Sequence, residues 1–185
     1  MGNKVVILSF SGRKGGNCEA ISNFIEEFYN RTSVRLCEID SKSFHTCGNC
    51  NYECLTPGLI CPVLNEKQKY IMDTIIQADI VYYVIPNYCG YPCASYFTFN
   101  ERSVGYFNMD RALMKKYMDI KKRFIIVSNS ENHFADAMKQ QTNEEPEILY
   151  MKTGKYHKQS ITGDLLTSPA ARNDLLAFLS AESYL

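Results

Sequence analysis

A polar, glycine-rich segment directly follows the first apolar run of the chain, residues 5–8. Residues 9–18 read Ser-Phe-Ser-Gly-Arg-Lys-Gly-Gly-Asn-Cys, and a helical pattern begins at their end. A loop between a strand and a helix directs backbone N–H groups and the positive end of the helix dipole at one point, which favours a phosphate. An ordinary solvated turn is the alternative. The predicted phosphate-binding residues are Ser11, Arg13, Gly15, Gly16, Asn17 and Cys18.

The side chains and the glycine spacing of this segment narrow the class of ligand. A guanidinium, a hydroxyl and an amide all suit phosphate oxygens. The spacing matches neither G-x-G-x-x-G, which is typical of dinucleotide sites, nor G-x-x-x-x-G-K-[ST], which is typical of nucleoside triphosphate sites. A mononucleotide is therefore the better interpretation.

Four cysteines stand within fifteen residues, with the spacing C-x2-C-x3-C-x6-C. Thiolates at such spacing can converge on a tetrahedral zinc ion or on an iron–sulfur cluster, and both remain open on chemical grounds. His45 lies two residues before the first of them and could substitute as a ligand, although a lone loop histidine is usually solvated. The candidate metal ligands are Cys47, Cys50, Cys54 and Cys61.

The elements that must position these residues follow from hydrophobic periodicity. Short apolar runs predict buried strands at 5–8, 34–39, 80–85, 124–127 and 148–151. Amphipathic patterns predict helices over 17–30, 65–77 and 170–180, with two more within 87–119. Pro86 is expected to end the third strand. Residues 41–62 break the pattern and are interpreted as a cysteine-rich insertion in a single domain, 1–185.

Strands that alternate with helices imply parallel pairing and right-handed crossovers. The predicted fold is α/β, a flavodoxin-like three-layer sandwich with a five-stranded parallel sheet of order 2-1-3-4-5. Ligands in such folds bind beyond the carboxyl ends of the strands, where the strand order reverses, here between the first and third strands. The loop after the third strand should therefore meet the phosphate loop, and its aromatic residues would suit a planar ring; packing of these aromatics on their own surroundings is the alternative. The predicted residues are Pro86, Asn87, Tyr88, Cys89, Gly90 and Tyr91.

Charge and composition exclude several partners. Lysine plus arginine and aspartate plus glutamate number twenty each, without a long basic run, which argues against nucleic acid and anionic membranes. The N-terminus enters a strand without a signal sequence, so we expect a cytoplasmic protein. Eight cysteines in that compartment are not expected to form a disulfide framework.

Residues 4–130 resemble the NADPH-dependent FMN reductase and iron–sulfur flavoprotein superfamily. The family's first loop, Gly-Ser-Pro-Arg-x-x-Gly-Asn-Thr, aligns with residues 10–18, where Cys18 replaces the threonine. The family's Pro-x-Tyr-x-Gly motif matches Pro86, Tyr88 and Gly90, and Phe97 stands where a lysine is usual. The resemblance implies bound FMN, with Asn129 beside it by position. It also favours iron over zinc at the cysteine insertion, as a [4Fe–4S] cluster, although the later gaps are looser here and many relatives keep such cysteines without a cluster.

The function that this resemblance implies is an FMN-dependent NAD(P)H oxidoreductase that reduces a flavin, quinone or similar acceptor. The flavin supplies the chemistry, so no catalytic side chain is assigned. One alternative is an iron–sulfur flavoprotein that acts as an electron-transfer carrier. Another is a flavodoxin-like binding protein that has lost FMN, for which Cys18 and Phe97 argue. The family usually forms homodimers, and the aromatic-rich stretch 91–107 is a candidate contact that core packing explains in part.

Overall fold

The computed structural model describes residues 4–29, 34–40, 42, 44, 46–48, 50–129 and 133–181. Its centre is a parallel sheet in the order β2-β1-β3-β5-β6, so the predicted strand order is confirmed. A two-residue strand, β4 (Tyr91–Pro92), pairs antiparallel with the end of β3 and was not predicted. The parallel strands are β1 (Val5–Ser9), β2 (Val34–Glu38), β3 (Ile80–Tyr88), β5 (Lys121–Ser128) and β6 (Glu147–Lys152).

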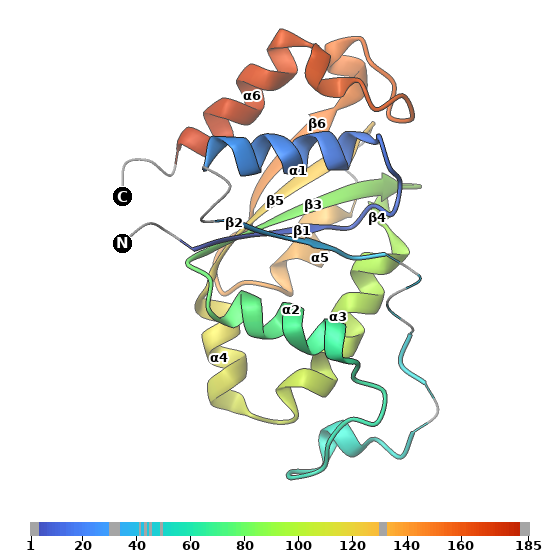
Figure 1. Cartoon of the computed structure of the whole chain (residues 1–185), viewed down its shortest axis with the longest axis vertical. Coiled ribbons are helices and arrows are strands. Elements are labelled where there is room, and N and C mark those ends of the chain that lie inside the picture. The colour runs from blue at the N-terminus through green and yellow to red at the C-terminus, as the bar shows by residue number, and fades with distance from the viewer. Residues whose placement is uncertain are drawn as a thin grey trace.

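Helices cover both faces of the sheet and complete three layers (Figure 1). One face carries α1 (Asn17–Phe28) and α6 (Pro169–Ser180). The other carries α2 (Glu66–Ile76), α3 (Ala94–Phe107), α4 (Arg111–Asp119) and the short α5 (Phe134–Lys139). Short 3-10 turns are η2 (Glu53–Leu55), η3 (Thr153–Tyr156) and η4 (Leu165–Thr167). The predicted helices are confirmed, whereas α5, with six residues, is too short to show a periodic pattern.

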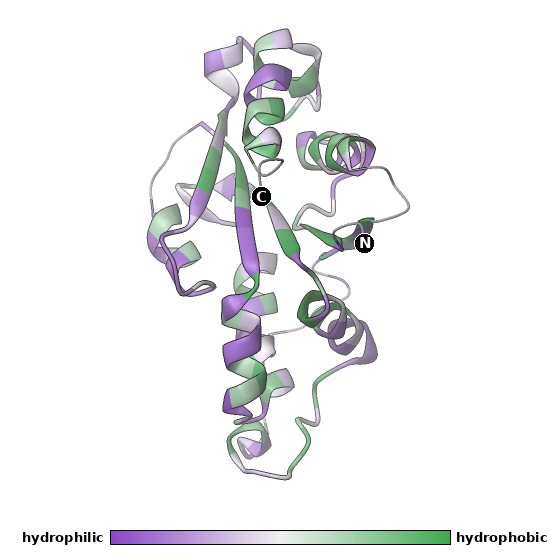
Figure 2. Ribbon diagram, turned by 90° about the vertical axis from the view of Figure 1, so that its left-hand side faces the viewer, coloured by the Kyte–Doolittle hydropathy of each residue, from purple (hydrophilic) through white to green (hydrophobic). Residues whose placement is uncertain are grey.

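Two hydrophobic clusters fill the space between the sheet and the helix layers. Alternate residues of each strand point to opposite faces, so Leu8 and Tyr83 join the α2–α3 side while Ile7 and Tyr82 join the α1–α6 side. The strands are buried on both faces for this reason, which explains their continuous apolar runs. Figure 2 shows hydrophobic and hydrophilic residues on the same helices, as expected for helices that cover a core. In the described part of the chain no helix is both long and apolar enough to cross a membrane.

The expectation that Pro86 ends the third strand is wrong, because β3 continues to Tyr88. The backbone N–H of Phe10 donates to the carbonyl of Val84, so Val84 faces β1. Pro86, two residues later, faces the same side, beyond the point where β1 has stopped pairing at Ser9. The missing N–H of proline therefore costs no ladder hydrogen bond there, and β5 still pairs along the other side as far as Pro86.

The cysteine insertion leaves the sheet and lies against α3, beyond the helix layer (Figure 1). Its described residues are irregular apart from η2, as predicted. The insertion exposes large apolar side chains, with Tyr52 at 71% and Ile60 at 82% exposure. It is held at Gly105 of α3, where an added Cβ would lie only 2.8 Å from the Cys61 sulfur. Glycine at this position is what allows the insertion to pack so closely on the helix.

Lys122, at the start of β5, is a buried base. Its ammonium donates hydrogen bonds to the carbonyls of Tyr117 and Ile120 at the end of α4, and it lies 4.2 Å from the centre of the Tyr117 ring. Burial lowers the pKa of Lys122 to about 7, against a smaller opposite effect of Asp119. The unfolded chain, where lysine titrates near 10.5, thus binds a proton more readily than the folded one between these two values.

We expect stability to rise with pH across that window because of Lys122. Replacement of the buried base in Lys122→Met should stabilise the protein more at about pH 7 than at about pH 9.5, by a difference on the order of a few kcal/mol. Urea unfolding of both proteins at both pH values measures this, with the partly exposed neighbour Lys121→Met as control. If the free energies of unfolding of the wild type and of Lys122→Met differ by the same amount at both pH values, the lowered pKa of Lys122 is contradicted.

Candidate functional site

The predicted phosphate-binding segment, residues 10–18, is here called the phosphate loop. It starts where β1 stops pairing. The N–H of Ile39 donates to the carbonyl of Ser9 on one side, and the N–H of Phe10 donates to the carbonyl of Val84 on the other. The chain then turns through residues 11–16 into α1, which begins after Gly16. The loop therefore lies at the carboxyl end of the sheet, at the point where the strand order reverses.

The N-terminus of α1 has no side-chain cap, and in this it resembles α3 and α5 and differs from α2, α4 and α6. Asn65, Asp110 and Ser168 each accept a hydrogen bond from the first turn of α2, α4 and α6. The residue at this position of α1 is Gly16, which has no side chain to do so. The first-turn N–H groups and the helix dipole of α1 consequently suit an anion.

The loop residues before Gly16 have three different surroundings. The N–H of Gly15, whose φ is +67°, donates to the Glu19 carboxylate at 2.5 Å. Lys14 forms an ion pair with Glu38 at the end of β2, at 2.7 Å. Arg13 is exposed, and its backbone N–H donates to the Ser11 hydroxyl at 3.3 Å. Arg13 is thus the cation of this loop whose side chain extends to solvent without an ion pair to a described residue.

Asn17 and Cys18 are placed in the interior, which differs from the role predicted for their side chains. Asn17 is 3% exposed, and its amide bonds to residues 159–165. Cys18 is also 3% exposed and packs in the core between α1 and the sheet. Burial raises the pKa of the Cys18 thiol to about 12, with a smaller contribution from Cys93. In this arrangement their backbone N–H groups, rather than their side chains, face the predicted phosphate position.

The predicted ring-binding segment is a β-hairpin at the end of β3. Cys89 and Gly90 both have positive φ, 55° and 84°, as the two central residues of a type I′ turn do. The Asn87 side chain accepts a hydrogen bond from the Gly90 N–H at 2.8 Å and stabilises the turn. Cys89 is exposed at the tip of this turn, whereas Cys93 is buried.

The two tyrosines of the hairpin present aromatic surface to the solvent at this edge. Tyr88 is 63% and Tyr91 50% exposed. Tyr91 stacks on His133, with 4.7 Å between ring centres and 9° between planes. The sequence analysis missed His133 because no motif marks it and it lies more than forty residues from Tyr91 along the chain. Pro86 lies one residue before Asn87 within β3.

Polar side chains at the ends of the next strands bond to one another. The Asn87 amide donates to the Ser128 hydroxyl, and the Thr153 hydroxyl donates to Asn129. Asn129, which was predicted by position, therefore lies at the same edge as the hairpin. Thr153 was missed, although its place directly after the last strand could have indicated it.

The structure brings the four candidate metal ligands into one neighbourhood. Cys47, Cys54 and Cys61 line a small apolar cavity of about 190 Å³ beside α3. Burial raises the pKa of the Cys54 thiol, and the thiols of Cys61, Cys47 and Cys50 raise it further. Among the residues described, no three ligating side chains converge closely enough to hold a metal ion. His45 lies outside the described residues.

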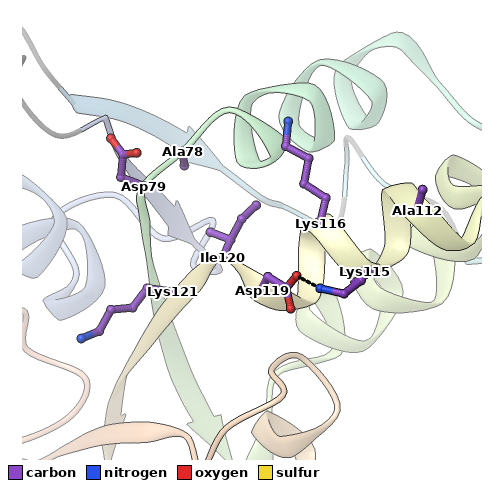
Figure 3. A pocket seen from close by; sticks show the side chains of 8 residues that line it. All are labelled: Ala78, Asp79, Ala112, Lys115, Lys116, Asp119, Ile120 and Lys121. Carbon is purple, nitrogen blue, oxygen red and sulfur yellow. Dashed lines mark hydrogen bonds and ion pairs between the residues drawn. The ribbon is translucent and has the colours of Figure 1, made fainter.

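Another cavity, of about 540 Å³, lies at the opposite edge of the sheet (Figure 3). It is formed where β3 and β5 begin, and Lys115, which bonds to Asp119, is among the charged residues around it. Ligand sites of doubly wound sheets lie at the carboxyl ends of the strands, so this cavity is not part of the predicted site.

Several solved structures share this arrangement of strands and helices. A Trp repressor binding protein from Bacillus subtilis is 13% identical, with a TM-score of 0.60 over 95% of this chain and 97% of that one. An NAD(P)H:(acceptor) oxidoreductase flavoenzyme from Paracoccus denitrificans is 11% identical, with a TM-score of 0.57 over 96% of each chain. An azoreductase from Bacillus anthracis is 12% identical, with a TM-score of 0.57 over 95% and 98%. No family model and no curated protein sequence matches the chain.

The fold is flavodoxin-like. The similar structures fall in the class of proteins to which the sequence resemblance pointed, and at these identities they establish the fold alone.

The aromatic-rich stretch considered as a dimer contact divides into two groups. Tyr96 and Phe99 are buried in the core at 1% and 0% exposure. Tyr91 and Phe97 are exposed at 50% and 47%, so only these two belong to the surface at this end of α3. Phe97, in the position of the family's lysine, thus faces the solvent.

We predict that Glu19 stabilises the phosphate loop in the absence of ligand. Glu19→Ala should lower the free energy of unfolding by about 0.5–1 kcal/mol, because it removes both the hydrogen bond to Gly15 and a negative charge from the first turn of α1. Glu26→Ala, near the other end of the same helix, is the control and should not destabilise. Equal losses in both variants, measured by denaturant unfolding, would contradict this role.

Proposed function

We propose that the protein is an FMN-dependent NAD(P)H oxidoreductase. The observation that carries this proposal is the uncapped N-terminus of α1, with Arg13 beside it, at the same edge of the sheet as the aromatic hairpin 87–91. The phosphate loop follows β1 and the hairpin ends β3, and these two strands are neighbours. A mononucleotide could therefore place its phosphate at the loop and its ring at the hairpin.

The residues of the two loops fit different parts of FMN. Arg13, the Ser11 hydroxyl and the N–H groups from Gly16 to Cys18 would hold the phosphate, whose charge the helix dipole stabilises. The hairpin from Asn87 to Tyr91 would contact the isoalloxazine ring, with Asn129 nearby. Bound FMN would accept a hydride and pass electrons onward, while the protein supplies binding, orientation and hydrogen bonds.

The donor and acceptor in this proposal rest on the resemblance and on similarity in fold. The Paracoccus denitrificans flavoenzyme with this fold is an NAD(P)H:(acceptor) oxidoreductase. We infer a nicotinamide donor and a flavin, quinone or similar acceptor by analogy with it. We also propose a homodimer that uses Tyr91 and Phe97, the exposed aromatic residues near the site.

Arg13→Ala should weaken FMN binding at least tenfold, the equivalent of about 1.5–3 kcal/mol for a charge-assisted hydrogen bond. Riboflavin, which lacks the phosphate, should bind the variant and the wild type equally. Lys14→Ala is the matched control, because it removes a neighbouring positive charge that is held by Glu38. Flavin fluorescence titration gives both affinities. An unchanged FMN affinity of Arg13→Ala removes Arg13 from the site, and a wild type that binds no flavin refutes the function.

A second candidate function, electron transfer through an iron–sulfur cluster, rests on the cavity shared by Cys47, Cys54 and Cys61. The described side chains do not form a metal-ligand set in this conformation. Cluster binding would therefore have to draw the insertion together around the four sulfurs, Cys50 included. The irregular backbone of this segment, with η2 as its only regular turn in the part described, is compatible with such a change.

For this candidate, protein purified without oxygen should contain about four irons and four sulfides per chain. Cys50→Ser should abolish the iron and leave FMN binding intact, because the phosphate loop is a separate segment. Cys89→Ser, an exposed thiol outside the insertion, should keep the iron. If metal analysis finds zinc instead of iron, the four cysteines form a zinc site and not an iron–sulfur cluster. The absence of both metals leaves the cysteines as structural or redox thiols.

A further inference from the structure

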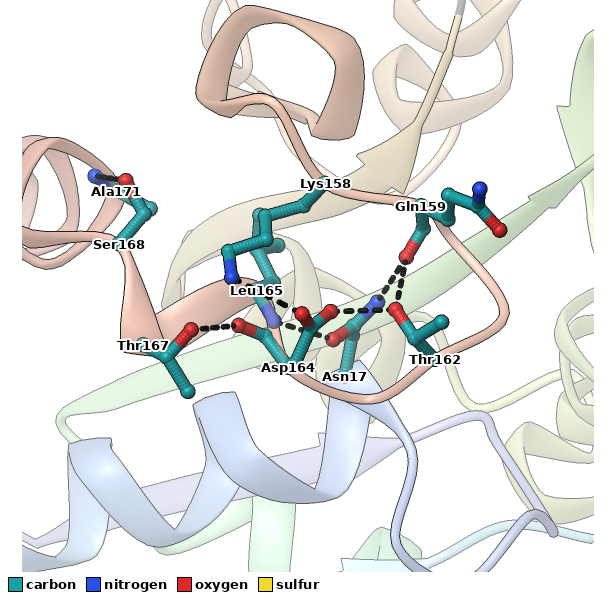
Figure 4. A network of polar contacts seen from close by, with 9 residues as sticks. All are labelled: Asn17, Lys158, Gln159, Thr162, Asp164, Leu165, Thr167, Ser168 and Ala171. Carbon is teal, nitrogen blue, oxygen red and sulfur yellow. Dashed lines mark hydrogen bonds and ion pairs between the residues drawn. The ribbon is translucent and has the colours of Figure 1, made fainter.

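The segment 157–165, here called the strap, connects η3 to η4 and crosses the N-terminus of α1 (Figure 4). The Asn17 amide nitrogen donates hydrogen bonds to the carbonyls of Gln159 and Ser160, at 3.5 and 3.1 Å. The Asn17 side-chain oxygen accepts one from the N–H of Leu165, at 3.0 Å. The buried side chain of Asn17, the first residue of α1, thus bonds to the strap at residues 159–160 and at its last residue, Leu165.

These contacts direct the polar atoms of the Asn17 side chain at the strap. The amide nitrogen lies 3.1 Å from the Ser160 carbonyl, with the Gln159 carbonyl further away at 3.5 Å. A phosphate oxygen can only accept from such a group. In this arrangement the Asn17 side chain is buried and bonded to the strap, although its sequence position suggests contact with a phosphate.

A second contact joins the strap to the same loop through backbone alone. Gly163 approaches Gly15 so closely that a Cβ on Gly163 would lie 2.0 Å from the Gly15 carbonyl oxygen. Gly163 also has a φ of +77°. Any other residue here would collide with the phosphate loop and adopt a strained conformation, and the colliding atom belongs to a backbone that cannot rotate away.

The strap is itself well fixed. Lys158 forms an ion pair with Asp164 at 3.0 Å, and the Thr162 hydroxyl contacts Asp164 and the Gln159 carbonyl. At its end, Leu165 is fully buried in the core beneath α1 and α6. A segment fixed in this way can hold the neighbouring pair Gly15-Gly16, the residues of the phosphate loop with the widest choice of backbone conformations.

We propose that the strap holds the phosphate loop in its binding conformation, and that Asn17 and Gly163 are positioning residues for FMN. Asn17 acts through the strap and not by contact with the phosphate. The inference rests on the proposed function, since it concerns the same FMN site. Without the strap, FMN binding would have to fix the backbone of Gly15 and Gly16. The entropy cost of fixing them would weaken the binding of the phosphate group.

Gly163→Ala is the sharpest test, because residue 163 need not touch the ligand. We expect it to weaken FMN binding at least tenfold and riboflavin binding less than twofold, both measured by fluorescence titration. Gly58→Ala is the matched control, since Gly58 also has a positive φ, +83°, but nothing within 4 Å of an added Cβ. It should leave both affinities unchanged. A loss for riboflavin as large as that for FMN would overturn the proposal, because it indicates general damage to the fold.

Asn17→Ala keeps the test valid if Gly163→Ala does not fold. Alanine is a good helix former, and this variant should show the same selective loss of FMN affinity. When both single variants fold, the double variant should lose little more than either one, because both act through the strap. Losses that multiply, or a loss in Asn17→Ala with none in Gly163→Ala, would assign Asn17 to the phosphate directly and overturn the inference.

Amide hydrogen exchange of the protein without FMN separates this inference from the proposed function. Gly163→Ala and Asn17→Ala should each accelerate exchange in residues 14–18, whereas Gly154→Ala, with open space around an added Cβ, should not. A wild type that fails to bind FMN refutes the function and leaves this readout intact. Unchanged exchange in residues 14–18 would show that the strap does not hold the loop.

Discussion

The handedness of the strand crossovers is the constraint on which the rest of the structure depends. A right-handed path from β1 to β2 places α1 on one face of the sheet, and the return from β2 to β3 places α2 on the other. The chain therefore leaves β1 and β3 toward opposite faces. Backbone hydrogen bonds from Ile39 to Ser9 and from Phe10 to Val84 join β2, β1 and β3 up to this point. The phosphate loop and the hairpin lead to helices on opposite faces as a result of this divergence, before any side chain is considered.

The same constraint explains why the end of the chain meets its beginning. The crossovers after β2, β3 and β5 all pass over the face opposite α1, so α1 would cover its own face alone. α6 fills that layer, and the chain must cross from the edge strand β6 to reach it (Figure 1). The strap is part of this crossing, which carries it over the N-terminus of α1. The topology thus brings the strap close to the phosphate loop. The hydrogen bond from Asn17 to Ser160 and the close approach of Gly163 to Gly15 then join the two segments.

The sequence predicted those features that depend on local pattern. Continuous apolar runs such as 80–85 and 124–127 identify strands buried on both faces, and their alternation with helical patterns leads to the strand order. Features that depend on distant partners were not predictable in this way. The proline at 86 was misread because its missing donor is harmless only where β1 has ended. The burial of Asn17 depends on residues more than 140 positions away, and the stack of Tyr91 on His133 depends on a turn whose central cysteine is not a typical residue for positive φ.

α3 contacts both the phosphate loop and the cysteine insertion. At its start, the Cys93 thiol and the Ser95 hydroxyl donate hydrogen bonds to the carbonyl of Phe10, the residue at which the phosphate loop begins. Ten residues after Ser95, about 15 Å along the helix axis, Gly105 lies against the Cys61 sulfur of the insertion. Buried side chains of α3 pack closely in the core, so we expect the helix to move as a unit. A rearrangement of the cysteine insertion can therefore be transmitted to the phosphate loop by a displacement of α3, through the hydrogen bonds to the Phe10 carbonyl.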